Sequence, residues 1–245
     1  MKRVKLTVAY DGTAYCGWQV QPNEITIEGV LNKVLSEFLN EDIQVTGASR
    51  TDSGVHALGN VAVFDTQARM PAEKMSYALN QRLPKDIVIR NSCEVPEDFH
   101  PRHCDCIKTY EYRIYNDEFQ NPVTRLYAHF VYRHLNLEDM RKAASYIIGE
   151  HDFKSFCASG SQVKETVRTI YSLDIIEENK LITIRIRGNG FLYNMVRIIA
   201  GTLINVGTGL IKPEAVKQII EAKDRTKAGP TAPANGLTLA EIKYM

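Results

Sequence analysis

The segment at residues 47–60, G-A-S-R-T-D-S-G-V-H-A-L-G-N, brings a cation, a carboxylate and an imidazole together among three glycines. Arg50 lies two residues before Asp52, so in an extended chain both side chains point to the same side. A carboxyl group with a pKa of about 3.9 is ionised at neutral pH, and a nearby arginine keeps it ionised. The pattern therefore favours a nucleophile or a charge-stabilising group over a general acid, with Asp52 as the reacting residue and His56 close by.

An ordinary turn is the alternative for Asp52 taken alone, because an aspartate before Ser-Gly often caps backbone N–H groups. The flanking Gly47, Gly54 and Gly59 weaken that alternative. They allow a tight backbone that approaches a ligand closely, which an exposed turn does not require.

Arg197 is the only charged residue in the stretch 191–206, F-L-Y-N-M-V-R-I-I-A-G-T-L-I-N-V. A helix that is apolar nearly all round is predicted to be buried. A buried cation needs a partner, because an unpaired buried charge costs several kcal/mol. We expect Arg197 to pair with Asp52. The alternative is that its aliphatic stem carries the charge to the surface.

The strand pattern K-T-Y-E-Y-R-I-Y places Lys108, Tyr110, Tyr112 and Ile114 on one face. Tyrosines in strands usually pack in the core, and we expect this of Tyr112. Tyr110 lies beside Lys108 near the start of the strand, where its ring is a candidate for stacking on a nucleic-acid base. Core packing is the alternative for Tyr110 too.

Metal and cofactor sites have little support. The spacing H-x-x-H-C-x-C of His100, His103, Cys104 and Cys106 matches no strong zinc pattern. The sequence contains no P-loop and no G-x-G-x-x-G motif, so no nucleotide cofactor is indicated. We expect neither a metal nor a cofactor.

Composition narrows the class of protein. The 245 residues have a formal net charge of +1, so any nucleic-acid site must be a local concentration of Arg and Lys. The five cysteines are odd in number and irregularly spaced, which is typical of reduced thiols. The opening residues do not resemble a secretory signal, and no apolar run approaches the ~20 residues that span a bilayer. We therefore expect a cytoplasmic protein with no membrane association.

Hydrophobic periodicity predicts the order strand, helix, strand, strand, helix, strand in each half of the chain. Helices are expected at 27–39 (with Thr26 as N-cap), 72–83, 137–148, 191–206 and 214–222, and strands at 4–8, 43–47, 60–66, 86–95, 107–115, 167–176, 181–187 and 237–244. This order is that of the split-βαβ, ferredoxin-like (RRM-like) unit. The predicted class is α+β, with an N-terminal half at 1–104 that contains the Asp52 loop and a C-terminal half at 105–245.

The motifs, in order, resemble those of the tRNA pseudouridine synthase A family. G-A-S-R-T-D-S-G-V-H-A is close to the family signature G-A-G-R-T-D-A-G-V-H-A, with Ser49 and Ser53 as small departures. A-Y-D-G-T-A-Y-C-G-W-Q-V-Q-P, K-T-Y-E-Y-R-I-Y, G-E-H-D-F-K-S-F, N-G-F-L-Y-N-M-V-R-I-I-A-G and A-K-D-R-T-K-A-G-P-T-A-P-A-N-G-L also match. The resemblance therefore covers the whole chain.

The resemblance implies two ferredoxin-like halves that share a mixed, mainly antiparallel sheet with a central RNA-binding cleft. It implies isomerisation of uridine to pseudouridine without cofactor or metal, at tRNA positions 38, 39 and 40 of the anticodon stem-loop. It also implies a homodimer that binds tRNA.

Residue roles follow from the same resemblance. Asp52 becomes the catalytic aspartate, which either attacks C1′ or takes a ribose proton, and Arg197 holds it charged and oriented. Arg50 helps to flip the target uridine out of the stack, and Tyr110 stacks on the flipped base. His56 either contacts RNA or makes a hydrogen bond to the backbone.

Two other classes of function remain as alternatives. A non-catalytic RNA-binding protein on the same fold would need exposed aromatics in RRM-type motifs, and the sequence has none. A hydrolytic glycosidase would need two functional carboxylates, and only Asp52 has an evident setting.

Overall fold

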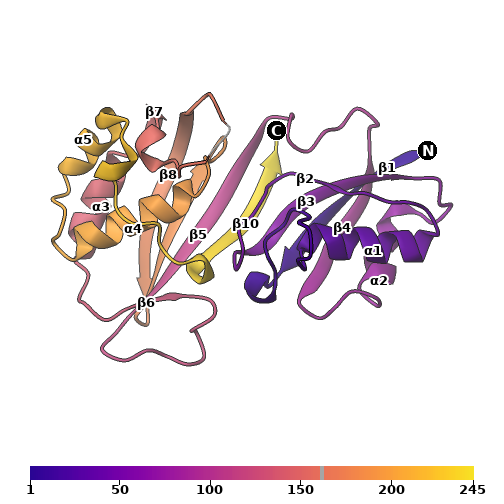
Figure 1. Cartoon of the computed structure of the whole chain (residues 1–245), viewed down its shortest axis with the longest axis horizontal. Helices are drawn as coiled ribbons and strands as arrows, with labels where there is room; N and C mark the ends of the chain where they lie inside the picture. Colours follow the sequence, from indigo (N-terminus) through magenta and orange to yellow (C-terminus); the bar gives the residue numbers. More distant parts are fainter. Residues whose placement is uncertain (161–162) are drawn as a thin grey trace. The chain divides into compact units, whose positions relative to one another are not determined.

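The computed structural model describes residues 1–160 and 163–245, and the chain divides into two compact units (Figure 1). Unit 1 comprises Met1–Asp105 and Thr238–Met245, and unit 2 comprises Cys106–Leu237. Both units combine strands with helices, which confirms the α+β class. The sequence predicts a division after residue 104, with the last strand in the second half. In the structure the division falls after Asp105, and the last strand lies with unit 1.

Unit 1 follows the predicted order of elements. Its elements are β1 (Lys2–Tyr10), α1 (Ile27–Leu39), β2 (Thr46–Gly47), β3 (His56–Thr66), α2 (Ala72–Leu79), β4 (Ile87–Val95) and β10 (Leu237–Tyr244). β1 pairs antiparallel with β3 and with β4, and the short β2 pairs antiparallel with β3. β10 runs parallel to β3 and aligns Thr238 with His56. The C-terminal strand therefore meets β3 where the candidate loop ends.

Side-chain hydrogen bonds lie at the helix boundaries in unit 1. Thr26 caps α1 as predicted, because its Oγ1 accepts a hydrogen bond from the Gly29 N–H at 3.2 Å. Helix α2 ends at Leu79, earlier than the predicted residue 83. The side chain of Asn80 exchanges two hydrogen bonds with the backbone of Ile89, at 2.8 and 2.9 Å. These bonds attach the residue that follows the helix to β4.

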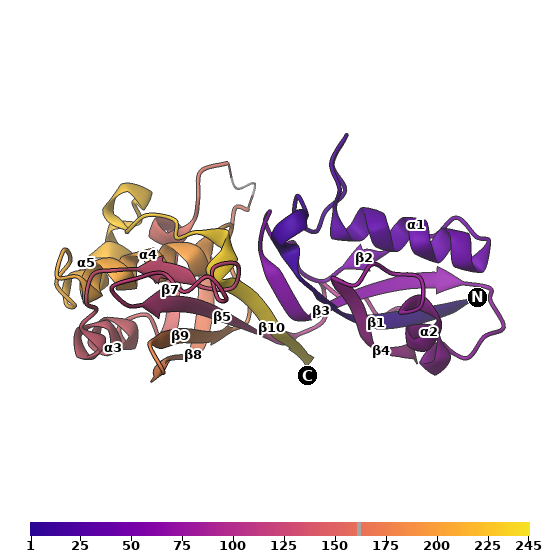
Figure 2. The same ribbon diagram turned by 90° about the horizontal axis from the view of Figure 1, so that it is seen from below.

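Unit 2 is built around an antiparallel set of strands. Its elements are β5 (Cys106–Asn116), β6 (His129–Val131), α3 (Leu137–Ser145), β7 (Gly149–Asp152), β8 (Val167–Glu178), β9 (Leu181–Gly188), α4 (Met195–Gly207) and α5 (Ala215–Ala222). β5 pairs with β9, β9 with β8 and β8 with β7, and Figure 2 shows β8 and β9 side by side. The predicted hairpin is confirmed, with Asn179 and Lys180 in the left-handed region at its turn. The short β6 and β7 are not predicted by the periodicity.

Helix α4 begins at Met195, four residues later than predicted. Asn194 adopts a left-handed conformation with φ of 58°, and the Tyr193 carbonyl accepts a hydrogen bond from the Ala158 N–H at 3.0 Å. Residues 191–193 are therefore outside the helix, and Phe191 packs separately. No helix in the described part of the chain is long and apolar enough to cross a membrane.

Candidate functional site

The loop that contains Asp52 connects β2 to β3 and is fixed to the fold at both ends. Its first half is held by a buried amide: Asn60 is fully buried, and its Nδ2 donates to the Ser49 carbonyl at 3.0 Å. The Tyr10 hydroxyl forms a hydrogen bond of 2.7 Å with Thr51 Oγ1. A buried polar group without a partner costs about 1–3 kcal/mol, so these bonds give the loop one preferred position.

The second half of the loop rests on the segment that follows β1. The Thr51 carbonyl accepts from the Trp18 N–H at 3.0 Å, and the Gly54 N–H donates to the Tyr15 carbonyl at 3.4 Å. The Asp52 carbonyl accepts from the Val55 N–H at 3.1 Å, which closes a tight turn. Gly54 has φ of +75°, a conformation that glycine adopts without strain. The Asp52 side chain is thus presented, half-buried, at the turn of a constrained loop.

His56 is the first residue of β3 and is buried, with 5% of its surface exposed. Its Nδ1 lies 3.1 Å from the Gly12 backbone nitrogen and 3.1 Å from Oδ1 of Asp11. An unprotonated Nδ1 accepts a hydrogen bond from Gly12, and a protonated Nδ1 donates to Asp11. The backbone hydrogen bond that the sequence left open for His56 is therefore present, and contact with RNA stays a prediction.

Arg50 projects from the same loop and is exposed. Among the residues that the structure describes, it forms no ion pair with a carboxylate. A guanidinium in this position is available to an anionic ligand, since it is not neutralised by the protein.

Tyr110 lies on β5 in unit 2 and is largely buried, with 7% of its surface exposed. Its ring meets Phe191 edge to face, with ring centroids 5.1 Å apart and an interplanar angle of 83°. This contact fixes the plane of the ring. Tyr112 is fully buried and donates its hydroxyl hydrogen to the Pro233 carbonyl at 2.9 Å, so it belongs to the core as predicted.

Arg197 lies on α4 and is half-buried, as its place in an apolar helix predicts. Its Nε donates to the Ala232 carbonyl at 2.7 Å, and its Nη1 donates to Oδ1 of Asn194 at 2.8 Å. The segment that supplies Ala232 packs closely on α4, because a Cβ at Gly201 would lie 1.9 Å from the Pro230 carbonyl oxygen. Arg197 is therefore held in place within unit 2, and its pairing with Asp52 stays a prediction.

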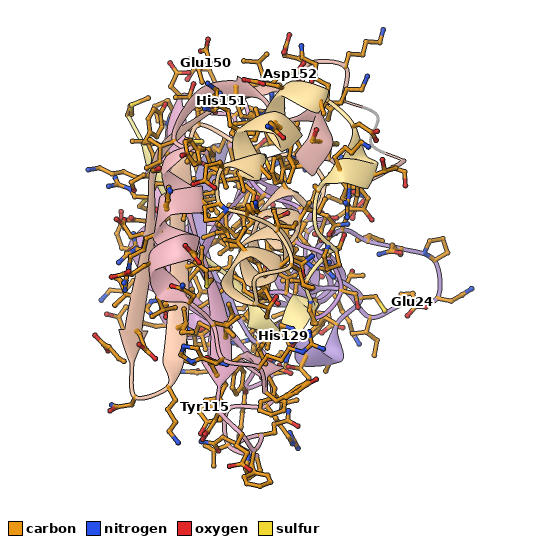
Figure 3. All side chains as sticks on the ribbon, turned by 90° about the vertical axis from the view of Figure 1, so that its left-hand side faces the viewer. Glu24, Tyr115, His129, Glu150, His151 and Asp152 are labelled. Carbon is orange, nitrogen blue, oxygen red and sulfur yellow. The ribbon has the colours of Figure 1, made fainter. Side chains whose placement is uncertain are left out.

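Acidic residues and a histidine gather at β7, where Figure 3 shows Glu150, His151 and Asp152 together at one end of unit 2. The hydroxyl of Thr166 donates to Oδ1 of Asp152, and Nζ of Lys223 lies 2.9 Å from Oδ2. The Thr166 bond is the main cause that holds the pKa of Asp152 below its usual range. The Asp152 carboxylate therefore joins β7 to the segment before β8 through Thr166 and to the end of α5 through Lys223.

The rings of His100 and His103 contact each other at an interplanar angle of 34°, with ring centroids 4.1 Å apart. Within residues 1–160 and 163–245, no group of three or more His, Cys, Asp or Glu side chains is arranged to hold a metal ion.

Several residues that build the site are not predicted from the sequence. Asn60 was read as part of an apolar strand, and Tyr10 and Trp18 appeared only within a motif. Some of their contacts join distant parts of the chain, since the bond between Tyr10 and Thr51 spans 41 residues. Arg102 contacts Gly47 across 55 residues. For Asn60 and Tyr10 the local signal was a polar or aromatic residue in an otherwise apolar strand, whereas Trp18 and Arg102 lie outside the strands.

Comparison with known proteins finds the same family that the sequence motifs resemble. A family model described as tRNA pseudouridine synthase matches residues 6–103 and 143–245. The chain is 52% identical over 245 residues to a tRNA pseudouridine synthase A of Ruminiclostridium cellulolyticum, and 51% identical over 244 residues to one of a Thermoanaerobacter species. A third relative, of the same name and from Brevibacillus brevis, is 46% identical. In each case all of both chains is covered.

Proposed function

Because this chain belongs to the tRNA pseudouridine synthase family, it is an isomerase that acts on tRNA, and we propose that Asp52 is its catalytic carboxylate. The observation that supports this most directly is the loop at 48–55. Buried side chains and backbone bonds hold it from both ends, while its carboxylate is half-exposed at the turn. A positioned, ionised carboxylate suits a reaction at the sugar carbon that bears the base.

The reaction breaks the bond between N1 of uracil and C1′, turns the base, and forms a bond between C5 and C1′. The C5 hydrogen is released as a proton, and N1 gains one, so the overall change is an isomerisation. Asp52 either attacks C1′ or takes a proton from the ribose. Both roles need the charged form of the carboxylate.

The substrate nucleotide must leave the base stack before this chemistry can occur. Flipping costs a few kcal/mol, which contacts to the extruded nucleotide must offset. Arg50 is exposed two residues from Asp52, where its charge can hold a phosphate beside the flipped uridine. We assign His56 a supporting role through Gly12, with RNA contact as a second role.

The proposed targets are uridines 38, 39 and 40 of the anticodon stem-loop, and the proposed active form is a cytoplasmic homodimer. These details follow from the family resemblance of the motifs. They are tested by sequencing the modified positions of a tRNA pool and by measuring the mass of the protein in solution.

Tritium release tests the reaction itself. The product has the same mass as the substrate, so the label must report the lost C5 hydrogen. Unmodified tRNA with tritium at C5 of uridine is incubated with the protein, and release to water is counted and mapped. Release from the anticodon arm supports the proposal. Tight binding of tRNA without any release would instead indicate a protein that only binds RNA, and free uracil would indicate a hydrolase.

Tyr110→Ala is expected to lower kcat/KM for tRNA by roughly 10- to 100-fold, because stacking of a base on an aromatic ring contributes about 1–3 kcal/mol. Tyr110→Phe keeps the ring and its contact with Phe191, so kcat/KM should stay within a few-fold of wild type. Initial rates of tritium release, with a melting temperature for each variant, measure the effect. Equal losses in both variants would show that the hydroxyl, and not the ring, is required.

Arg197→Met is expected to move the acid limb of the pH profile of kcat/KM upward by about one pH unit or more. A nearby cation lowers the pKa of a carboxyl group by about 1–3 units, so its removal raises the pH at which Asp52 becomes protonated. A purely structural role for Arg197 would lower activity at every pH and leave the limb in place. In the Asp52→Asn background, Arg197→Met should add little to the loss of activity.

A further inference from the structure

The segment between β4 and β5 brings a second arginine to the end of β2, directly before the loop of Asp52. Nε of Arg102 donates to the Gly47 carbonyl at 2.7 Å. The Arg102 backbone N–H donates to Nδ1 of His100 at 3.2 Å, and the His100 ring contacts that of His103. Both the backbone and the guanidinium of Arg102 are therefore held in place.

Gly47 itself is a tightly packed position. A Cβ there would lie 2.3 Å from Nε1 of Trp18, so the indole ring rests directly on the glycine backbone. Trp18 is fully buried. Arg102 is thus bound to a tightly packed position at the end of β2, three residues before Arg50.

The charges around Arg102 are unbalanced. Partial desolvation of its guanidinium lowers the pKa of Arg102, and the nearby charge of Arg50 lowers it further. Glu28 opposes this effect, but its Oε2 already accepts a hydrogen bond from the Val20 N–H at 2.9 Å. Among the described residues, neither arginine forms an ion pair with a carboxylate. The two positive charges repel each other, and an anion that binds both guanidinium groups relieves that repulsion.

The hydrogen-bonding capacity of Arg102 indicates the kind of anion. Its Nε is used by Gly47, whereas the Nη groups make no hydrogen bond within the described part of unit 1. Both Arg50 and Arg102 are exposed. Planar guanidinium groups with free N–H donors bind phosphate oxygens with matching geometry.

We propose that Arg102 is a substrate-binding residue that acts with Arg50 to bind one backbone phosphate of the RNA, next to the nucleotide presented to Asp52. That the RNA is tRNA rests on the proposed function. The ligand class, an RNA phosphodiester, rests on the two arginines.

A variant can separate this role from a structural one. In Arg102→Gln, Nε2 stands the same number of bonds from the backbone as Nε of arginine, so the hydrogen bond to Gly47 is kept while the charge and the Nη donors are lost. Arg102→Lys does the reverse, because it keeps a charge and loses the Nε donor. Arg90→Gln, at an exposed position on β4, removes the same charge elsewhere in unit 1.

The test is the affinity for unmodified tRNA at several salt concentrations, in the Asp52→Asn background so that the RNA does not change. Arg102→Gln is expected to raise Kd by about tenfold, as for a lost charge-assisted bond. It should also lower the slope of log K against log salt by about 0.7–0.9, as for one lost phosphate contact. Arg102→Lys should keep the salt dependence of binding seen with Arg102 intact in the same background, even if its melting temperature falls. In the active enzyme, Arg102→Gln should raise KM and leave kcat nearly unchanged.

A slope and Kd for Arg102→Gln equal to those of Arg90→Gln would overturn the proposal. So would a lower slope in Arg102→Lys, because that result would trace the effect to the bond with Gly47. Failure of the proposed function has a different signature, since it appears as absent tritium release by the wild-type protein. The salt slope then still decides whether Arg102 binds RNA phosphate.

Discussion

Asp52→Asn is expected to lower turnover on tRNA by roughly a thousandfold or more, while the fold and the affinity for tRNA are retained. Asparagine has the shape of aspartate but no charge, so it can neither attack C1′ nor take a proton. The loop should keep its position, because the bonds from Asn60 and Val55 involve backbone carbonyls of the loop. Single-turnover tritium release, tRNA binding and a thermal melt together measure the three expected results.

Asp42→Asn is the matched control, since it removes one carboxylate at an exposed position of unit 1. It should leave turnover at the wild-type level. Turnover by Asp52→Asn at the same level would exclude Asp52 as the catalytic residue. A parallel loss of melting temperature and of tRNA binding would instead show that Asp52 supports the structure of the loop.

Gly12→Ala is expected to lower the free energy of unfolding by roughly 3 kcal/mol and the melting temperature by roughly 6–12 °C. A Cβ at Gly12 would lie 2.0 Å from the Val55 carbonyl oxygen and 2.6 Å from its carbon. These are backbone atoms, so the loop must move as a whole. Val55 closes the turn that presents Asp52, and a displacement of about 1 Å at a reacting group can cost about a hundredfold in rate.

Gly190→Ala is the comparison for this effect, because the nearest atom to its Cβ would be Nε of Arg168 at 3.5 Å, an ordinary contact. It should change the melting temperature by only a degree or two. Differential scanning calorimetry of the two variants, beside wild type, gives the result. A melting temperature of Gly12→Ala equal to that of Gly190→Ala would mean that the chain near Val55 adjusts freely, contrary to a constrained loop.

Local signals in the sequence were sufficient for much of the fold. Thr26 caps α1 because its hydroxyl reaches a backbone N–H three residues away, which depends on nothing distant. The turn at Asn179 and Lys180 likewise depends on neighbouring residues that form one hairpin. The class of the fold and the position of the Asp52 loop follow from such signals, since hydrophobic period and turn chemistry act over a few residues.

Contacts between distant parts of the chain could not be predicted from those local signals. β10 pairs with β3 although nearly two hundred residues separate the two strands. The residue pattern of a single strand does not predict which other strand it will pair with. Helix α4 begins late because a distant N–H, that of Ala158, binds the Tyr193 carbonyl.

The candidate site shows the same division. Composition and spacing alone identified Asp52 and Arg50 as residues suited to chemistry, because a carboxylate and a cation two residues apart are a property of the chain itself. The support of Ser49 by Asn60 and the arrival of Arg102 at Gly47 are properties of the folded molecule. Such contacts depend on which buried groups need partners once the strands are assembled, and that requirement exists only in three dimensions.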